Sequence, residues 1–365
     1  MVTLVKSAGQ RNLGDRSDPY AGRVQVHRTP CYDLLVSLRA LFNPRTYEAT
    51  RAWAIEARGR LSPETAARGV FFFRGHETSP GYGVTRLVAA LPAGAEPREL
   101  ISAVRSMDAV ELALLMLDTG ETPAASLATF RDAMTGTVSD RAIARALSGE
   151  TASWSKLCRR VIADPADVQE EFALLLEDYE ATVFRSELDH VNEAIGRAEV
   201  RARELLAVLS TEVAIEQLTG GYTIDPHLKL SRIVLAPSAF IHPFVATRFD
   251  ESSGDALIVF GVRSASLEGY DTAPLDTDLL KTLRSLGDPG RLRLLRLLSR
   301  EALTTPELQV RIGLSPATVH HHLHQLRAAG LVRQERTKGG MRYSIRRDSA
   351  AELLARLHHL ILGSD

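Results

Sequence analysis

One stretch of this sequence decides the fold of its C-terminal part: Ser315-Pro316-Ala317-Thr318-Val319-His320-His321-His322-Leu323-His324-Gln325-Leu326-Arg327-Ala328-Ala329-Gly330. It opens with a hydroxyl side chain that can cap a helix and a proline suited to the first helical turn, and it closes on a glycine. Val319, Leu323 and Leu326 recur at helical spacing and form an apolar face. The opposite face carries small and short polar side chains. We therefore predict a helix over residues 316–329 that lies in a groove.

The segments on both sides of this helix complete a helix-turn-helix pattern. Thr304-Thr305-Pro306-Glu307 is a capping box at the start of a short preceding helix, and Gly313 ends that helix. Two extended runs, at 331–336 and 341–346, flank a turn that contains two glycines and predict a β-hairpin. A basic hairpin that follows a helix-turn-helix is typical of a wing.

Taken in order, these motifs resemble the ArsR-type winged helix-turn-helix transcriptional regulators over residues 275–362. The resemblance implies that the helix 316–329 enters the DNA major groove and that the wing touches the DNA backbone or minor groove. It also implies that the first and last helices of this module form a dimer interface. The rest of the chain resembles, more loosely, the long N-terminal domain of unassigned activity in a group of such regulators. The matching pieces are 286–295, 303–308, 314–323, 326–332 and Arg342-Tyr343.

The helix and the wing supply the predicted DNA contacts. Short polar side chains on the outer face of a groove-sized helix suit base edges, and basic side chains on the hairpin suit phosphates. His322 differs from its neighbours because it sits at the edge of the apolar face, where it can brace the helix or hold a phosphate. The predicted DNA-binding residues are Ser315, Ala317, Thr318, His320, His321, His322, His324, Gln325, Arg327, Arg333, Arg336, Lys338 and Arg342.

The first and last helices of the module carry more large aliphatic side chains than one small domain can cover. An ordinary core accounts for some of them, and a dimer seam accounts better for the whole set. The predicted dimerisation residues are Leu279, Leu280, Leu283, Leu353, Leu354, Leu357, Leu360 and Ile361.

Charge is distributed unevenly along the chain, although its net value is −1. Residues 275–365 contain 15 Lys and Arg against 9 Asp and Glu, and the remainder contains 29 against 36. A basic module joined to an acidic body is the electrostatic arrangement of a protein in which one domain binds nucleic acid and the other avoids it.

Cysteine usage and hydropathy indicate the compartment. Cys31 and Cys158 are too few and too far apart for a disulfide framework, which favours a reducing cytoplasm. The N-terminus shows no cleavable signal, and no run approaches the roughly 18–20 apolar residues of a membrane span. We expect a cytoplasmic protein with no membrane partner.

The sequence predicts a mainly α protein with small β elements, an α+β fold. Residues 1–25 are polar and predict a disordered tail. Residues 26–270 predict a mostly helical sensor or oligomerisation domain. Residues 275–365 predict the winged helix-turn-helix for DNA binding and dimerisation.

Two features are expected inside the N-terminal domain. An almost unbroken helical pattern over residues 164–218 predicts two or three helices joined by short breaks. Strand-like runs at 228–235, 240–245 and 256–261, with a turn between 250 and 255, predict a small antiparallel sheet.

A metal site is the alternative reading of the histidines in the central helix. His320 and His324 lie four residues apart on one helix face, but the sequence supplies no further ligands nearby. The cysteine pair of one metal site of the family has no counterpart over 305–312, and Ala350 stands where another type of site needs histidine. We expect no metal and no cofactor.

The N-terminal domain lacks recognisable catalytic motifs. It contains no P-loop, no nucleophile elbow and no His-Glu-x-x-His motif, so we expect no enzymatic activity. A ligand pocket is conceivable around its aromatic residues, although a packed core more often explains such residues. These residues are Trp53, Phe71, Phe72, Phe73 and Trp154.

The sequence as a whole predicts a sequence-specific DNA-binding transcription regulator, with repression favoured over activation. As a homodimer it would bind an inverted repeat of double-stranded DNA, with the helix 316–329 in the major groove and the wing 332–346 on the backbone. A small-molecule effector of unknown identity could act through the N-terminal domain. One alternative is a metabolite-binding protein or enzyme that uses the winged helix only for dimerisation. Another is an interaction module that a partner recruits to DNA.

Overall fold

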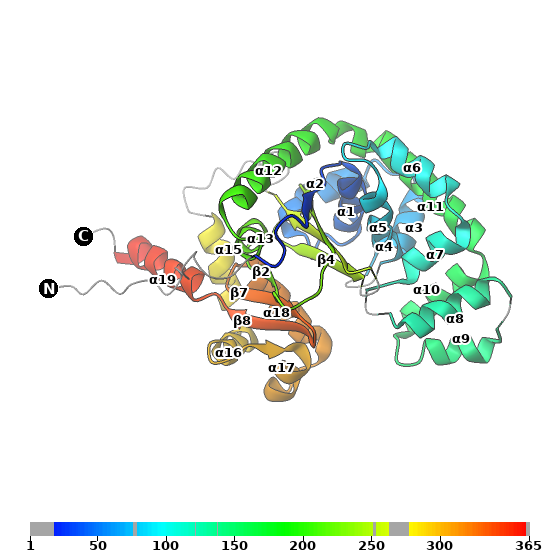
Figure 1. The fold of residues 1–365 in the computed structure, drawn as a ribbon. Helices are drawn as coiled ribbons and strands as arrows, with labels where there is room; N and C mark the ends of the chain where they lie inside the picture. Colours follow the sequence, from blue (N-terminus) through cyan, green and yellow to red (C-terminus); the bar gives the residue numbers. More distant parts are fainter. Residues whose placement is uncertain are drawn as a thin grey trace.

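A helical N-terminal body with its own four-stranded sheet is joined to a smaller C-terminal module by a second four-stranded sheet (Figure 1). The computed structural model describes residues 18–75, 79–120, 122–136, 138–250, 253–262 and 277–362. We use "N-terminal body" for residues 18–262 and "C-terminal module" for residues 277–362. In Figure 1 the helices of the N-terminal body curve around its sheet, and the C-terminal module lies below one end of that curve.

Helices make up most of the N-terminal body. Several begin where the sequence offers a cap, as where the Ser62 hydroxyl accepts a hydrogen bond from the Thr65 amide at 3.1 Å. Such a cap satisfies an amide that has no partner within the helix. The described helices are α1 (Cys31–Phe42), α2 (Arg51–Arg58), α3 (Pro63–Phe73), α4 (Pro80–Gly83), α5 (Thr85–Ala90), α6 (Pro97–Ser106), α7 (Ala109–Leu117), α8 (Ala124–Met134), α9 (Asp140–Ala146), α10 (Ala152–Ala163), α11 (Pro165–Thr182), α12 (Leu188–Val208) and α13 (Thr211–Thr219).

Helix α1 lies at the centre of this body. Every residue of α1 except Arg39 is buried, and the helix touches α2, α3, α4 and strand β3 (Arg232–Ser238). The long helical pattern of 164–218 forms the three helices α11, α12 and α13, as the sequence predicts. Within the described ranges, no helix has the length and apolar character needed to cross a membrane.

The sheet of the N-terminal body is mixed, which corrects the prediction of an antiparallel sheet. Its strands lie in the order β1 (Val24–Val26), β3, β5 (Asp255–Gly261) and β4 (Val245–Asp250). β1, β3 and β5 run parallel, and β4 runs antiparallel to β5. The expected turn between 250 and 255 joins β4 to β5, but residues 239–244 connect two strands instead of forming one.

Both faces of this sheet are buried, and this explains why the strand pattern misled the prediction. Alternate residues of β3 and β5 face either the core around α1 or a second cluster that includes residues of α12 and α13. A parallel sheet covered on both faces is apolar along whole strands, and its strand order depends on elements that are distant in the sequence. The residues facing the α1 core are Val234, Ala236, Leu257 and Val259, and those facing the second cluster are Ile233, Leu235, Ala256, Ile258 and Phe260.

Residues 18–25 belong to the fold, where the sequence predicts a disordered tail. The Tyr20 side chain is buried, and its hydroxyl donates a hydrogen bond to the Asp225 carbonyl at 2.6 Å. Asp18 accepts a hydrogen bond from the Thr211 amide at 2.7 Å. These two contacts with distant residues hold β1 in the sheet, and a polar local sequence gives no sign of them. Residues 1–17 lie outside the described residues.

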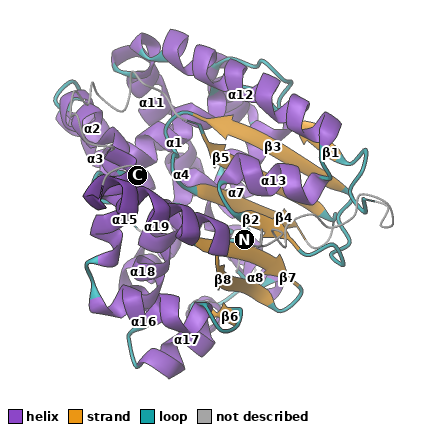
Figure 2. Cartoon of the chain, turned by 90° about the vertical axis from the view of Figure 1, so that its left-hand side faces the viewer, coloured by secondary structure: helices purple, strands orange, loops and turns teal. Residues whose placement is uncertain are grey.

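The C-terminal module has its own apolar core and a sheet to which the N-terminal body contributes a strand. The sheet order is β2-β7-β8-β6, and the edge strand β2 (Tyr222–Ile224) comes from the body. Figure 2 shows the strands of both sheets following one another from β3 to β7 and β8. The elements of the module are α15 (Thr277–Leu286), α16 (Pro289–Leu298), β6 (Leu303–Thr304), α17 (Thr305–Ile312), α18 (Pro316–Ala328), β7 (Val332–Thr337), β8 (Gly340–Ile345) and α19 (Arg347–Leu362).

A carboxyl group is buried where α1 meets the end of β3. Asp33 is fully buried, and its Oδ1 accepts hydrogen bonds from the Ser238 hydroxyl at 2.6 Å and from the Phe240 amide at 3.2 Å. Its Oδ2 has no hydrogen-bond partner. Burial raises the pKa of Asp33 to about 7, although the hydrogen bonds from Ser238 and Phe240 act in the opposite direction. The folded protein therefore favours the protonated carboxyl.

The substitution Asp33→Asn is expected to stabilise the protein at high pH only. Because the pKa in the folded state lies above its ordinary 3.8, the stability that the protonated group provides is complete below about pH 4 and is lost as the pH rises through 7. A neutral amide avoids this loss. The free energy of unfolding of the variant should exceed that of the unmodified protein by about 2–4 kcal/mol at pH 8 and by little at pH 4.

Urea unfolding at pH 4, 6 and 8 measures this difference. Asp189→Asn, at an exposed position at the start of α12, is the matched control and should change the stability little at any pH. A variant at position 33 that is no more stable than the unmodified protein at pH 8 would show that the carboxylate is not destabilised by burial.

Candidate nucleic-acid interface

Local sequence signals produce the helix-turn-helix formed by α17 and α18. The Thr304 amide donates to the Glu307 carboxylate at 2.7 Å, so the predicted capping box is present. Gly313 ends α17 with a φ of 72°, a left-handed conformation that glycine adopts without strain. The Ser315 hydroxyl then accepts a hydrogen bond from the Thr318 amide at 3.2 Å and starts α18.

The core of the C-terminal module fixes how α18 is rotated about its axis. Val319, Leu323 and Leu326 are buried and belong to the same apolar cluster as Leu294 and Leu308. Because successive residues of a helix project about 100° apart, the burial of these three turns the remaining positions toward the surface. The outer face of α18 is therefore set by the packing of its inner face.

The predicted DNA-binding residues fall into three groups by exposure. The start of α18 and the hairpin β7–β8 supply the exposed group. The exposed residues are Ser315, Ala317, His321, Lys338 and Arg342. The partly exposed residues are Thr318, His320, His324, Gln325, Arg327, Arg333 and Arg336, and His322 is buried.

His322 faces the core of the C-terminal module, so the structure does not support it as a DNA contact. Its side chain is 10% exposed, and its Nε2 lies 3.7 Å from Oδ1 of Asp288. Asp288 also caps α16 by accepting a hydrogen bond from the Arg291 amide at 2.9 Å. Burial lowers the pKa of His322, while the neighbouring Asp288 raises it. His322 therefore braces α18 against the start of α16.

Two predicted contacts in the second half of α18 meet the N-terminal body. The His324 ring stacks on the Phe244 ring, with centroids 3.8 Å apart and planes inclined by 21°. Arg327 lies near the phenol groups of Tyr343 and Tyr222, and burial lowers its pKa. The second half of α18 is thus engaged within the chain.

Among the described residues, no three His, Cys, Asp or Glu side chains gather as a metal site would require.

The basic residues of the hairpin divide in the same way. Arg333 of β7 forms an ion pair with Glu216 of α13, and the guanidinium of Arg336 lies 5.1 Å from the centre of the Phe249 ring. Lys338 is exposed at the turn between β7 and β8. Half of the predicted wing cations therefore face the N-terminal body, and the others face outward.

The predicted dimerisation residues lie on two faces of α15 and α19. Leu279 and Leu353 are buried in the module core, and Leu283 and Leu357 are half-buried. The side chain of Leu280 lies outside the described part of the chain. α19 extends away from the rest of the molecule in Figure 1. Three of its large aliphatic residues are exposed and form an apolar face. This face consists of Leu354, Leu360 and Ile361, which are 66%, 47% and 67% exposed.

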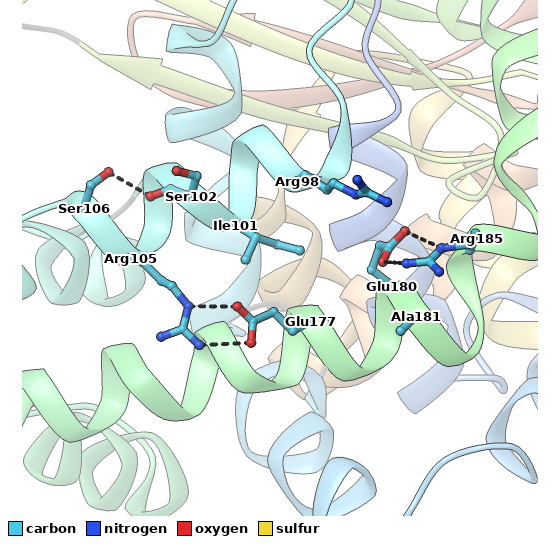
Figure 3. A pocket seen from close by; sticks show the side chains of 9 residues that line it. All are labelled: Arg98, Ile101, Ser102, Arg105, Ser106, Glu177, Glu180, Ala181 and Arg185. Atoms are coloured by element: carbon cyan, nitrogen blue, oxygen red, sulfur yellow. Dashed lines mark hydrogen bonds and ion pairs between the residues drawn. The ribbon is translucent and has the colours of Figure 1, made fainter.

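The N-terminal body has a surface pocket of about 640 Å³ between α6 and α11 (Figure 3). Its arginines are largely neutralised, since Arg105 pairs with Glu177 at 2.8 Å and Arg185 pairs with Glu180 at 2.7 Å. A second pocket, of about 370 Å³, lies beside Arg86 and Asp118. Neither pocket is lined by the aromatic residues that the sequence suggests, which are Trp53, Phe71, Phe72, Phe73 and Trp154.

The sequence does not predict the contacts of four residues around the candidate interface. Glu216, Phe244 and Phe249 come from the N-terminal body, far from α18 and the hairpin in sequence, and no local pattern marks them as neighbours of the interface. Asp288 alone carries a signal, because an acidic residue before Pro289 is a helix cap. That signal predicts its bond to the helix start but not its contact with His322.

The substitution Gly290→Ala is expected to destabilise the C-terminal module. A methyl group at position 290 would lie 2.8 Å from Nε2 of His322 and 3.0 Å from Oδ1 of Asp288. In most helices alanine is more stable than glycine by about 0.5–1 kcal/mol, but this contact should turn the gain into a loss of about 1–2 kcal/mol.

A double-mutant cycle with His322→Ala tests this contact by urea unfolding. If the His322 ring blocks the added methyl group, Gly290→Ala should no longer lower the free energy of unfolding in the His322→Ala background. Gly287→Ala is the control, because its methyl group would meet the Arg284 carbonyl at an ordinary 3.5 Å. An equal cost in both backgrounds would show that His322 does not limit the space at position 290.

The match to a protein-family model agrees with the geometry of α17 and α18. A family described as a helix-turn-helix domain matches residues 286–335. Among solved structures, the crystal structure of NolR from Sinorhizobium fredii is similar, with 28% identity over 26% of this chain and 100% of that chain and a TM-score of 0.21. No curated protein matches the chain. The C-terminal module contains a helix-turn-helix domain, which supports a DNA-binding regulator.

Proposed function

We propose that this protein is a transcriptional repressor of the ArsR type that binds an inverted repeat of double-stranded DNA as a homodimer. The observation that carries the proposal is the exposed first half of α18, presented by a helix-turn-helix beside a basic hairpin. In this proposal the hairpin β7–β8 is the wing. The protein acts in the cytoplasm, uses no metal or cofactor and has no enzymatic activity.

The first half of α18 has the side chains that major-groove recognition needs. Ala317 is small and exposed, so the helix can come close to the bases. The imidazole of His321 is exposed and can donate or accept a hydrogen bond at a base edge. Thr318 and His320 are partly exposed on the same half of the helix. These four residues are proposed to read the operator.

The hairpin supplies the proposed phosphate contacts. Lys338 is exposed at its turn, where an ammonium group can meet the DNA backbone. Arg342 is also exposed, and its guanidinium donates to the Ala302 carbonyl at 2.7 Å. A guanidinium has five N–H donors, so this bond orients Arg342 and leaves other donors for a phosphate.

The exposed face of α19 is the proposed dimer seam. Leu354 and Ile361 lie two turns apart on one side of the helix, with Leu360 beside them. A two-fold axis at such a seam brings the same face of two copies together. It would also set two copies of α18 about one turn of DNA apart, which matches an inverted repeat.

Selection of bound fragments from genomic DNA by the full-length protein tests the proposal. We expect a shared inverted-repeat site, with the logarithm of affinity falling steeply against the logarithm of salt concentration. His321→Ala should weaken binding to the selected fragment by about tenfold or more and leave binding to unrelated DNA unchanged. Lys338→Ala should weaken binding to both and lower the salt slope by about one.

Lys156→Ala, at an exposed position on α10, is the matched control and should leave the affinity and the salt slope unchanged. Failure to enrich any site, or weak binding that ignores sequence, would rule out a repressor that acts alone. The result would then favour a metabolite-binding protein that uses the module for dimerisation.

Charge at the α19 face should separate the proposed dimer. In the variant Leu354→Asp with Ile361→Asp, two carboxylates would have to be buried in the seam, and we expect a monomer by analytical ultracentrifugation. Ile55→Asp is the control, because Ile55 is as exposed as Leu354, at 66%, but lies on α2. A dimer that persists in the double variant would place the seam elsewhere.

A further inference from the structure

We infer that the N-terminal body and DNA compete for the same side chains of the C-terminal module, so that the docked arrangement in this structure has low DNA affinity. The inference rests on the proposed function and concerns its regulation. It is based on the contacts of His324, Arg333 and Arg336, which are predicted DNA contacts that instead meet residues of the N-terminal body.

The docked arrangement is held first by a backbone pairing. β2 of the N-terminal body runs parallel to β7 of the hairpin, with Thr223 opposite Glu335. The Gln334 amide donates to the Gly221 carbonyl at 3.1 Å, and the Asp225 amide donates to the Arg336 carbonyl at 2.9 Å. β7 therefore lies between β2 and β8 in the sheet, and its outer edge is closed.

Charged side chains beside this pairing are neutralised or buried. Arg333 forms an ion pair with Glu216, and Arg346 donates to the Gly220 carbonyl at 2.9 Å. Burial lowers the pKa of the Arg346 guanidinium. A carboxylate that pairs with a guanidinium neutralises its charge and repels a phosphate, so Arg333 binds a phosphate less strongly while it is paired with Glu216.

The second half of α18 is covered by the same body. Phe244 stacks on His324 and also packs edge-on against Tyr47 of the body, with ring centroids 5.5 Å apart. Ala328, one turn further along α18, packs against the main core of the body. The second half of the outer face of α18 is therefore occupied by protein, while Ala317 and His321 in the first half remain exposed.

The two uses of these side chains exclude each other. The ring of His324 cannot stack on Phe244 and enter a DNA groove at the same time. Arg333 cannot keep its full ion pair with Glu216 while it binds a phosphate. Because Ala317, His321 and Lys338 stay exposed in the docked arrangement, docking should weaken DNA binding and not abolish it. Couplings of this kind usually change an affinity by about 5- to 150-fold.

Variants of the N-terminal body that loosen the docking test the inference. Glu216→Gln removes the partner of Arg333, and Phe244→Ala removes the ring that covers His324. Each should tighten binding to the inverted-repeat fragment recovered by genomic selection at least about fivefold. Glu204→Gln, at an exposed position on α12, changes the net charge equally and should leave the affinity nearly unchanged. Equal effects of Glu204→Gln and Glu216→Gln would mean that net charge, not docking, controls binding.

A reversible disulfide that locks the docked arrangement provides the opposite test of the inference, because it prevents undocking. Neighbouring strands lie about 4.8 Å apart, within the roughly 4.4–6.8 Å between the Cα atoms of a disulfide. The pair Thr223→Cys with Glu335→Cys replaces two register partners on β2 and β7. The native Cys31 and Cys158 are buried and should not interfere. Oxidation should weaken binding to the selected fragment at least about tenfold, and a reductant should restore it.

The outcomes separate the inference from the proposed function. Oxidised and reduced protein that bind the fragment equally well would overturn the competition and leave the DNA-binding function intact. Protein that binds DNA in neither state, and in no loosened variant, would refute the proposed function, and the inference would fall with it. The single-cysteine variants, which cannot form the bridge, should bind DNA alike with and without reductant.

Discussion

The parallel pairing of β2 with β7 is the contact on which the arrangement of the two parts of this protein depends. A strand at the edge of a sheet leaves amides and carbonyls unpaired, and β2 closes that edge of the hairpin. The chain reaches this position through Gly221, whose φ is 120° and where a Cβ would lie 2.8 Å from Cδ of Arg346. Glycine is thus required for the close approach of the two parts. The ion pair and ring contacts beside β2 follow from that approach.

Helix α18 is held from two directions. Its inner face is buried in the C-terminal module, where His322 and Asp288 connect it to the start of α16. The second half of its outer face meets the N-terminal body through His324 and Phe244. Only the first half of its outer face is free of both. A helix restrained in this way has a defined orientation, which recognition of base edges needs, and its accessible surface depends on the position of the N-terminal body.

A short segment after β3 joins the interior of the N-terminal body to α18. The Phe240 amide in this segment donates to the buried carboxyl of Asp33, and Phe244, four residues later, stacks on His324. The buried end of α1 and the outer face of α18 are therefore separated by one connection between strands. β3 is an inner strand of the mixed sheet, and the segment 239–244 that follows it contacts Asp33 of α1 and His324 of α18.

The sequence by itself determined the elements that depend on neighbours in the chain. The capping box at Thr304, the cap at Ser315 and the glycine at 313 predict the helix-turn-helix because each acts over three or four residues. Tertiary structure alone decided the mixed sheet, the anchoring of Tyr20, the burial of His322 and the covering of His324. These features depend on which strands and helices meet. The hydrophobic pattern of a strand indicates that the strand is buried but not which element buries it. The exposed half of the candidate interface was therefore predictable, and the half that meets the N-terminal body was not.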